Sequence, residues 1–323
     1  MFQAIGSKVE NCEPINFREA VELMNLEGHE CIDLFSLANR VRGRLGNRVD
    51  LCSIINAKCG LCPEDCKFCA QSVHNDAGIT PHPLLDEDDI LDMALMMQEE
   101  GAARFCIVTS GKEASAGEFE RILNAVRRIR KETKLLICVS IGMLRKESAQ
   151  ALKEAGVTRI HHNLESSQTF FNKICTTHSY AEKINTVRIA REAGLEVCCG
   201  GIIGMGETIR DRIKLAFALK ELDVDSIPIN ILTPIKGTPL KAEPISPIEV
   251  LKTIAVFRLI NPGKNIRIAG GREVNLRDLQ CLSLIAGANG LLLGNYLTTP
   301  GRKPGDDIRM IRDLGLIPGG VHV

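Results

Sequence analysis

Four cysteines within eleven residues form the part of this sequence best suited to chemistry, in the run Cys59-Gly-Leu-Cys62-Pro-Glu-Asp-Cys66-Lys-Phe-Cys69. Read as two Cys-x2-Cys pairs, they offer four thiolates, which is the ligand set of a structural zinc. Read as Cys62-x3-Cys66-x2-Cys69, they offer three thiolates to a four-iron cluster, and one iron stays free to bind a small molecule and pass it an electron. The three-residue gap between the pairs is short for one tetrahedral ion. The spacing therefore favours the iron–sulfur interpretation over zinc, and zinc over two disulfides.

Other cysteines lie inside apolar, β-branched segments. Cys106, Cys138 and Cys198 occur in three such segments, and Arg267 occurs in a fourth. The strands of a closed parallel barrel are apolar on both faces, so buried polar side chains in them need an explanation. If these segments surround one lumen, the three cysteines could ligate a second cluster, with Arg267 opposite them.

Packing is the competing explanation for these residues. A buried cysteine commonly serves as a small hydrophobe, and Arg267 could instead be paired with Glu165 or Glu273. Cys59 and Cys199 stay open, because each is close to a proposed ligand. Five further cysteines have no such company and are expected to be structural: Cys12, Cys31, Cys52, Cys175 and Cys281.

The segment 158–164 and the residue after it carry several polar side chains. Alternation with a period of two places His161, Asn163 and Glu165 on one face of a strand. We expect this face to point into the lumen, and we expect His162, on the other face, to be a buried histidine with its hydrogen bonds satisfied.

A glycine-rich run, Gly200-Gly-Ile-Ile-Gly-Met-Gly-Glu207, precedes an expected helix. It lacks the glycine order of a dinucleotide-binding fold and the Lys-Ser/Thr of a P-loop. We expect it to let the backbone approach a ligand closely, with Glu207 near a helix N-terminus; a plain tight turn is the alternative.

Short β-branched segments alternate with amphipathic helices along the chain, which predicts a (β/α)8 barrel; an open, doubly wound sheet is the alternative. Residues 1–48 are expected to form an N-terminal helical extension and residues 49–323 the barrel. Asn16-Phe-Arg-Glu19 resembles a capping box. The expected strands are 51–56, 103–108, 135–141, 158–164, 196–203, 226–232, 265–269 and 290–293, and the expected helices are 86–100, 117–132, 146–155, 179–193, 207–222, 246–260, 275–286 and 305–314.

Composition excludes several classes of partner. Lys+Arg and Asp+Glu both number 40, and the chain has no Trp and two Tyr, so neither a basic field nor a base-stacking surface for nucleic acid is expected. No apolar run is long enough to span a membrane. Thirteen cysteines in a chain too long to need disulfide staples indicate a reducing, cytoplasmic location.

The three-cysteine run following the first expected strand resembles that of the radical S-adenosylmethionine (SAM) superfamily, and further motifs resemble those of the biotin synthase family. The resemblance covers roughly residues 45 to 315. The motifs are Cys62-Pro-Glu-Asp-Cys66-Lys-Phe-Cys69-Ala-Gln-Ser, Val197-Cys-Cys-Gly-Gly-Ile-Ile-Gly-Met-Gly-Glu207, Pro228-Ile-Asn230, Lys236-Gly-Thr-Pro-Leu240, Arg267-Ile-Ala-Gly-Gly-Arg-Glu273, Ala286-Gly-Ala-Asn289 and Leu297-Thr-Thr-Pro300.

The resemblance implies a set of ligands, each at a matching position. Cys62, Cys66 and Cys69 would hold a [4Fe–4S] cluster whose open iron takes SAM. The auxiliary [2Fe–2S] cluster, or a variant of it, would be held by Cys106, Cys138, Cys198 and Arg267. The SAM contacts would be Phe68, Asn163, Glu165 and Lys183, and the dethiobiotin contacts His161, Asn230, Thr298 and Thr299.

Three positions depart from the family's usual pattern. His161 stands where Asn is common, and Glu165 where Asp is frequent. Cys199 replaces a small residue such as Ser, so it could add or exchange a ligand of the auxiliary cluster. Cys59 has no counterpart among the family's ligands, which favours the three-thiolate interpretation.

The activity that the resemblance implies is the insertion of sulfur into dethiobiotin, giving biotin. Removing hydrogen from an unactivated C–H bond is beyond acid–base side chains, so no catalytic residue is expected apart from the cofactor ligands. A flavodoxin- or ferredoxin-type electron donor and a homodimer are implied as well. The alternatives are another radical SAM barrel enzyme, such as a hydrogenase- or pyrrolysine-type maturase, and a non-enzymatic zinc or electron-transfer protein.

Overall fold

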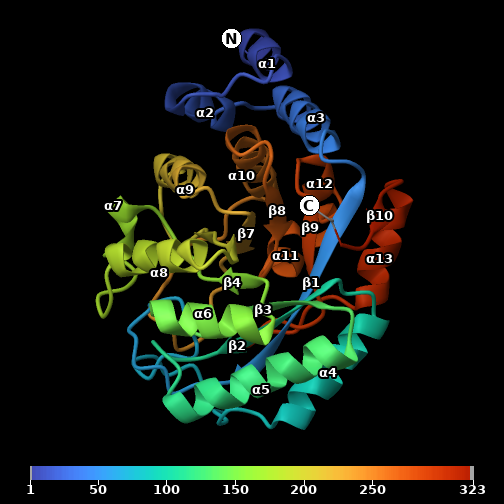
Figure 1. The fold of residues 1–323 in the computed structure, drawn as a ribbon. Helices are drawn as coiled ribbons and strands as arrows, with labels where there is room; N and C mark the ends of the chain where they lie inside the picture. The colour runs from blue at the N-terminus through green and yellow to red at the C-terminus, as the bar shows by residue number, and fades with distance from the viewer. Residues whose placement is uncertain (1, 321–323) are drawn as a thin grey trace.

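Parallel strands close into a barrel in the computed structural model, which describes residues 2–320 (Figure 1). β1 pairs with β2 on one side and with β9 on the other, so the sheet returns to its first strand and the open-sheet alternative is wrong. β5 and β6 together occupy the position between β4 and β7 in the barrel. β10 pairs with β1 outside the ring. The strands are β1 Arg48–Lys58, β2 Arg104–Thr109, β3 Leu136–Ser140, β4 Arg159–His161, β5 Glu196–Cys198, β6 Gly201–Ile203, β7 Ser226–Ile231, β8 Asn265–Ile268, β9 Gly290–Leu293 and β10 Ile317–Pro318.

The expected strand 196–203 is interrupted at the glycine pair. A Cβ atom on Gly200 would lie 1.9 Å from the Pro228 carbonyl oxygen, and one on Gly201 would lie 2.3 Å from that of Glu165. The close approach that these glycines allow is thus to neighbouring protein backbone. Glu207 accepts hydrogen bonds from the backbone N–H groups of Gly204 and Met205 and pairs with Arg212, so its carboxylate is committed to the turn.

Helices cover the outside of the barrel, and most begin and end within two residues of the expected positions. The single helix expected over 275–286 is wrong. The chain turns at Arg277, whose φ of +52° cannot be part of a right-handed helix, and divides into α11, a 3₁₀ turn (η1) and α12. The helices after β1 are α4 Glu87–Glu99, α5 Ala116–Glu132, α6 Lys146–Ala155, α7 Gln168–Phe171, α8 Tyr180–Glu192, α9 Ile209–Glu221, α10 Pro247–Ile260, α11 Arg272–Leu276, η1 Arg277–Leu279, α12 Leu282–Ile285 and α13 Pro304–Asp313.

Three helices precede the barrel: α1 Phe2–Glu10, α2 Phe17–Met24 and α3 Glu30–Gly43. The capping box at Asn16 and Glu19 is present at the start of α2, as the sequence predicts. α3 packs against α10 (Figure 1). Within residues 2–320, no helix combines the length and apolar character needed to cross a membrane.

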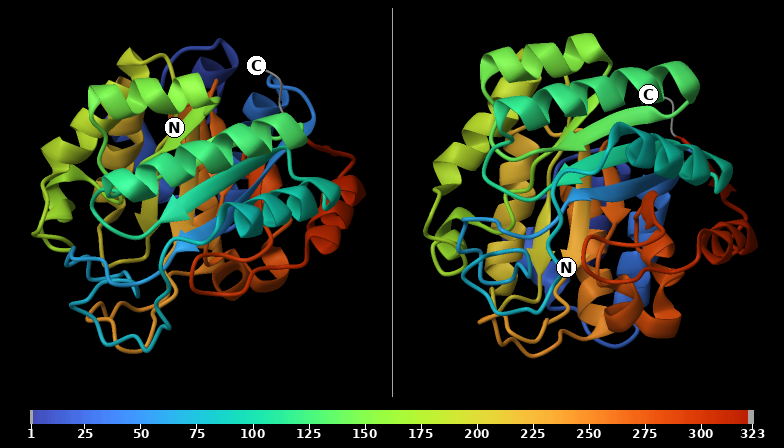
Figure 2. Two further views of the ribbon diagram at one scale, coloured as in Figure 1. Left: turned by 60° about the horizontal axis from the view of Figure 1, so that its bottom comes forward. Right: turned by 90° about the horizontal axis from the view of Figure 1, so that it is seen from below.

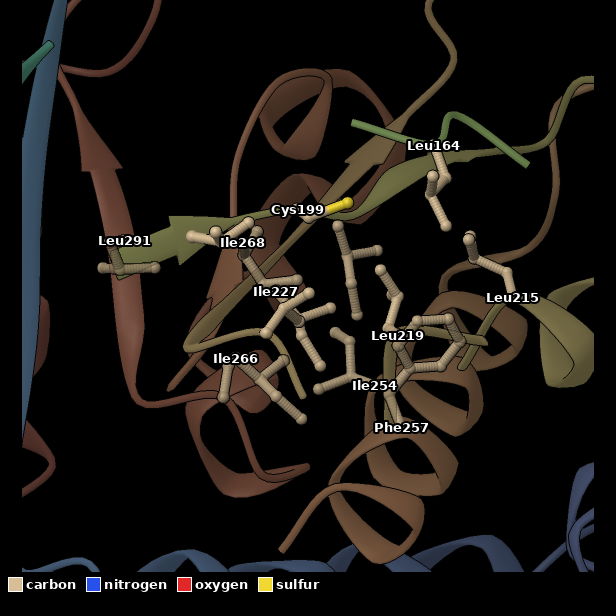
Figure 3. Packing of buried hydrophobic residues seen from close by; sticks show 14 of the residues in the cluster. Leu164, Cys199, Leu215, Leu219, Ile227, Ile254, Phe257, Ile266, Ile268 and Leu291 are labelled. Atoms are coloured by element: carbon tan, nitrogen blue, oxygen red, sulfur yellow. The ribbon is translucent and has the colours of Figure 1, made fainter. Parts of the chain in front are cut away.

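The main core lies between the barrel strands and the surrounding helices. Its residues come from the outward faces of the strands, such as Ile227 and Ile266, and from the inner faces of helices, such as Ile254 and Phe257 of α10 (Figure 3). Cys199 lies in this packing near Leu164 and is fully buried (Figure 3). Its side chain therefore belongs to the core outside the barrel wall.

Candidate active site

A cavity of about 430 Å³ lies inside the barrel and opens among the loops that follow the strands. The carboxyl ends of the strands are where parallel barrels place their active sites. The loop after β1 lies beside the loop after β7 at this end (Figure 2), where the Asp76 N–H donates to the Gly237 carbonyl at 3.1 Å. The predicted site residues that line the cavity are Cys62, Cys66, Phe68, Cys69, Cys106, Cys138, His161, Asn163, Glu165, Lys183, Cys198, Asn230, Arg267 and Thr298.

The loop after β1 brings three cysteines to the cavity. Cys62, Cys66 and Cys69 line it and are half-buried. Asn75 stabilises the loop by donating to the carbonyls of Cys66 at 3.1 Å and Cys69 at 2.8 Å. Cys59 is buried in a backbone bridge with His82 and does not line the cavity. The site thus presents three thiols from this loop.

The spacing of these sulfurs does not suit one tetrahedral ion. Zinc–sulfur bonds of about 2.3 Å would hold the sulfurs about 3.8 Å apart. Within the described residues, Cys59, Cys62, Cys66 and Cys69 supply no three sulfurs that lie within 4.8 Å of one another. These four cysteines therefore do not form a ready-made site for a single zinc ion.

One compact group of potential metal ligands does occur beside this loop. Cys175 Sγ lies 3.7 Å from Cys66 Sγ and 3.3 Å from His178 Nδ1, and His178 is hydrogen-bonded to Glu64. Cys175 is buried and does not line the cavity. Cys175 is therefore not isolated, contrary to the expectation from the sequence; the Cys-x2-His spacing of Cys175 and His178 is the sequence signal for this group.

His161, Asn163 and Glu165 line the cavity as predicted, although the strand expected over 158–164 is shorter and Asn163 and Glu165 lie in the loop after β4. His161 ends the strand, and Asn163 accepts a hydrogen bond from the Gly200 N–H at 3.0 Å. Burial raises the pKa of Glu165 and lowers the pKa of His161, so both side chains are biased toward their neutral forms. His162 is buried as expected, but its hydrogen bonds are not all satisfied, because its Nε2 atom has no partner, and the residue lines the cavity too.

The second cysteine group converges inside the barrel. Cys106, Cys138 and Cys198 are all buried and line the same cavity. Cys52 lines it with them and packs in one apolar cluster with Cys106 and Cys138, so reading Cys52 as isolated is wrong. A cysteine alternating with Ile54 on one face of a strand was the signal for this position.

Arg267 points into the barrel but has a different partner from those expected. Its guanidinium pairs with Asp50 at the start of β1, and neither Glu165 nor Glu273 takes part. Both side chains of the Arg267–Asp50 pair are almost fully buried. Cys199 is turned into the outer core and is not available as a ligand of the inner group.

The remaining predicted contacts differ in how directly they face the cavity. Asn230 accepts a hydrogen bond from the Gly270 N–H at 3.0 Å, which orients its amide at the end of β7. Lys183 reaches the cavity from the first turn of α8. Thr298 lines the cavity, whereas Thr299 does not and instead accepts the Tyr296 N–H through its carbonyl.

Comparison with known proteins places this chain in a family. The Radical SAM superfamily matches residues 59–219, and the Biotin and Thiamin Synthesis associated domain matches residues 228–317. A biotin synthase from Carboxydothermus hydrogenoformans is 53% identical over 317 residues, covering 97% of this chain and 98% of that protein. The chain belongs to the biotin synthase family. A biotin synthase from Heliobacterium modesticaldum is 55% identical over 299 residues, covering 92% of each chain.

Within the biotin synthase family, this chain is a radical SAM barrel enzyme, and the fold is shared more widely. Methylornithine synthase superposes with a TM-score of 0.84 at 24% identity, covering 98% of this chain and 97% of its own. The FeFe-hydrogenase maturase from Carboxydothermus hydrogenoformans gives a TM-score of 0.84 at 18% identity, covering 99% and 79%. At these identities the likeness concerns the fold alone.

Proposed function

We propose that this chain catalyses the insertion of sulfur into dethiobiotin to give biotin. The observation that carries the proposal is one cavity lined by two separate groups of cysteines. Cys62, Cys66 and Cys69 come from the loop after β1, and Cys106, Cys138 and Cys198 come from the barrel strands. Two groups of soft ligands facing one space fit a radical-generating cluster and a sulfur donor around a single substrate.

Cys62, Cys66 and Cys69 would hold the [4Fe–4S] cluster. Three thiols at a cavity wall, with Cys59 turned away, support a cluster with one iron left without a protein ligand. When bound, this cluster and SAM supply a 5′-deoxyadenosyl radical, which can take hydrogen from an unactivated C–H bond. The role of the chain is to position SAM and the substrate and to exclude water.

Cys106, Cys138 and Cys198 would hold the auxiliary cluster deeper in the barrel, and that cluster would supply sulfide to the substrate. Burial raises the pKa of Cys69 to about 11 and also raises that of Cys106, so both thiols are neutral in the metal-free chain near pH 7. Loading either cluster therefore releases protons from the protein.

Side chains between the two cysteine groups would position the small molecules. We assign Phe68, Asn163, Glu165 and Lys183 to SAM and His161, Asn230 and Thr298 to dethiobiotin. All seven line the cavity, which supports these roles. Thr299 does not line the cavity, so we propose that it supports dethiobiotin binding by holding the loop that carries Thr298, where its carbonyl accepts the Tyr296 N–H.

The chain also needs an external source of electrons, for which we propose a flavodoxin- or ferredoxin-type protein in the cytoplasm. All thirteen cysteines are free, which is consistent with a reducing compartment. We further propose that the chain acts as a homodimer.

Anaerobic incubation with SAM, a reductant and dethiobiotin tests the proposal. Both 5′-deoxyadenosine and biotin should form, and neither should form without reductant. Nucleoside without biotin would keep the radical SAM chemistry and contradict the substrate. A colourless protein that carries zinc would contradict both.

A further inference from the structure

β1 supplies a fourth cysteine at the level of the proposed auxiliary site. Cys52 is 7% exposed, lies on the inward face of β1 and lines the cavity. It shares an apolar cluster with Cys106 and Cys138, whereas its neighbour Leu51 packs in the outer core. The side chain of Cys52 thus faces the same space as the other strand cysteines.

Strand register places Cys52 in one layer with three of the proposed ligands. In a (β/α)8 barrel, inward side chains stack in layers of four drawn from alternate strands, and a layer climbs one residue per strand. Moving from Cys52 to the second strand along the sheet, and then two residues toward the carboxyl end of that strand, leads to Cys138. The same step leads from Cys138 to Cys198, from Cys198 to Arg267 and from Arg267 back to Cys52. The register partners along this path are Cys52–Arg104–Leu136, Cys138–Arg159–Glu196, Cys198–Ser226–Asn265 and Arg267–Gly290–Asp50.

The closed path means that Cys52, Cys138, Cys198 and Arg267 surround the barrel axis at one height. Cys106 lies in the next layer, on the strand between Cys52 and Cys138, and is the register partner of Cys138. Four cysteine side chains from two adjacent layers therefore line the same part of the barrel interior. Four cysteine thiolates are the usual ligand set of protein iron–sulfur clusters.

The fourth member of the layer, Arg267, is engaged elsewhere. Its guanidinium pairs with Asp50, which lies two residues before Cys52 on the same inward face of β1. Asp50 is therefore deeper in the barrel than Cys52, farther from the cavity opening. A guanidinium is charged at all ordinary pH values and has no acceptor site for a metal. A buried carboxylate beside it favours that charged form.

We propose that the auxiliary cluster of this chain is held by the four thiolates of Cys52, Cys106, Cys138 and Cys198, and that Arg267, fixed by Asp50, is a counter-charge and not a ligand. This inference rests on the proposed function, because it takes a second cluster in the cavity as given.

The test compares variants after anaerobic reconstitution with iron and sulfide, measuring iron and acid-labile sulfide per folded chain and the visible absorption spectrum. Cys138→Ala defines the content of a chain without the auxiliary cluster. Cys52→Ala should fall to that content. Cys52→Ser, with a harder oxygen ligand, should either fall to it or keep iron with a changed charge-transfer spectrum. Cys199→Ala, a buried cysteine on the outer side of the barrel wall, is the matched control and should keep the wild-type content.

The double variant Asp50→Asn/Arg267→Met removes both partners of the buried pair. Arg159, whose guanidinium lies 3.9 Å from Asp50, keeps Glu196 as its partner at 2.8 Å. It should keep the auxiliary cluster. The inference is overturned if Cys52→Ala and Cys52→Ser match the wild type while the double variant falls to the content of Cys138→Ala. If the wild type itself holds no more iron than Cys138→Ala, there is no auxiliary cluster and the proposed function fails as well. The iron content of the wild type thus distinguishes failure of the ligand assignment from failure of the proposed function.

A measurement on the unaltered chain avoids any folding defect. Protein labelled with ¹⁵N-arginine should show no strong ¹⁵N hyperfine coupling in the electron–nuclear double resonance spectrum of the reduced auxiliary cluster. A coupling of the size expected for nitrogen bound directly to iron would overturn the inference.

Discussion

The adjacent cysteines Cys198 and Cys199 point to opposite sides of the barrel wall. Cys198 lines the cavity, and Cys199 lies among Leu164 and other core residues (Figure 3). Successive side chains of a strand point to opposite faces, so one residue of offset separates a candidate ligand from a packing residue. The same alternation places Cys52 inside the barrel and Leu51 outside it.

Substitutions in the two cysteine groups should affect different reactions, SAM cleavage for the loop cysteines and biotin formation for the strand cysteines. Cys66→Ala should reduce SAM cleavage to the level seen without protein, because it removes one of the three loop thiols that line the cavity. Cys138→Ala should abolish biotin formation and leave 5′-deoxyadenosine measurable. Quantifying both products by chromatography checks this. Equal SAM cleavage by the two variants would contradict the division of roles, and Cys281→Ala, which lies outside the cavity, is the control.

Helix α8 positions Lys183 at the cavity through a well-formed start. Ser179 caps the helix and Glu182 completes a capping box by accepting the Ser179 N–H at 2.7 Å. Hydrogen bonds from the backbone and hydroxyl of Ser179, together with that from Lys112, lower the pKa of Glu182 to about 2. Local sequence therefore fixes where the first turn, and with it Lys183, begins.

This capping box predicts a pH dependence of stability. The Glu182 pKa is depressed from 4.5 to about 2 on folding, so its contribution is present above pH 4.5 and is lost as the pH falls toward 2. The free energy of unfolding of the wild type minus that of Glu182→Gln should therefore shrink over this window. Urea unfolding at a series of pH values measures it. A difference that stays constant from pH 6 to pH 3 would contradict the assignment.

At the scale of the whole molecule, the N-terminal helices are part of the folded unit. α3 packs on α10, and its residues Leu34, Leu37 and Val41 are almost completely buried. Figure 1 shows the three helices grouped at the end of the barrel where β1 begins. Without them, the outer surface of α10 would be exposed to water.

Removing residues 1–47 should thus destabilise the barrel severely. Each fully buried leucine contributes about 1.5–3 kcal/mol, and several such residues would be lost while their partners on α10 became exposed. Removing residues 2–10 alone should cost much less, since α1 buries only Ile5 and Val9. Thermal unfolding and solubility of both truncations test this. A 48–323 chain as stable as the full chain would show that the barrel is independent of the extension.

Much of the architecture was predictable because it depends on local signals. The strand–helix alternation and the helix starts at Asn16, Ser179 and Ser246 are read from neighbouring residues and agree with the structure. The break at Arg277 was not predictable, because the helical pattern around it continues through the turn. The partner of Arg267 was equally hidden, since Asp50 is 217 residues away in the chain.

The sequence by itself determined which chemical groups are present: a three-cysteine loop and cysteines within strands. Its motifs also indicated the biotin synthase family, which the chain's relatives confirm. These follow from residue type and short spacing, which need no folded structure. Only the tertiary structure decided which of the thirteen cysteines meet. Closing the sheet fixes a register, and that register turns Cys52 toward Cys138 and Cys198 while turning Cys199 into the core. No local pattern encodes which residues from different strands share one layer of the barrel.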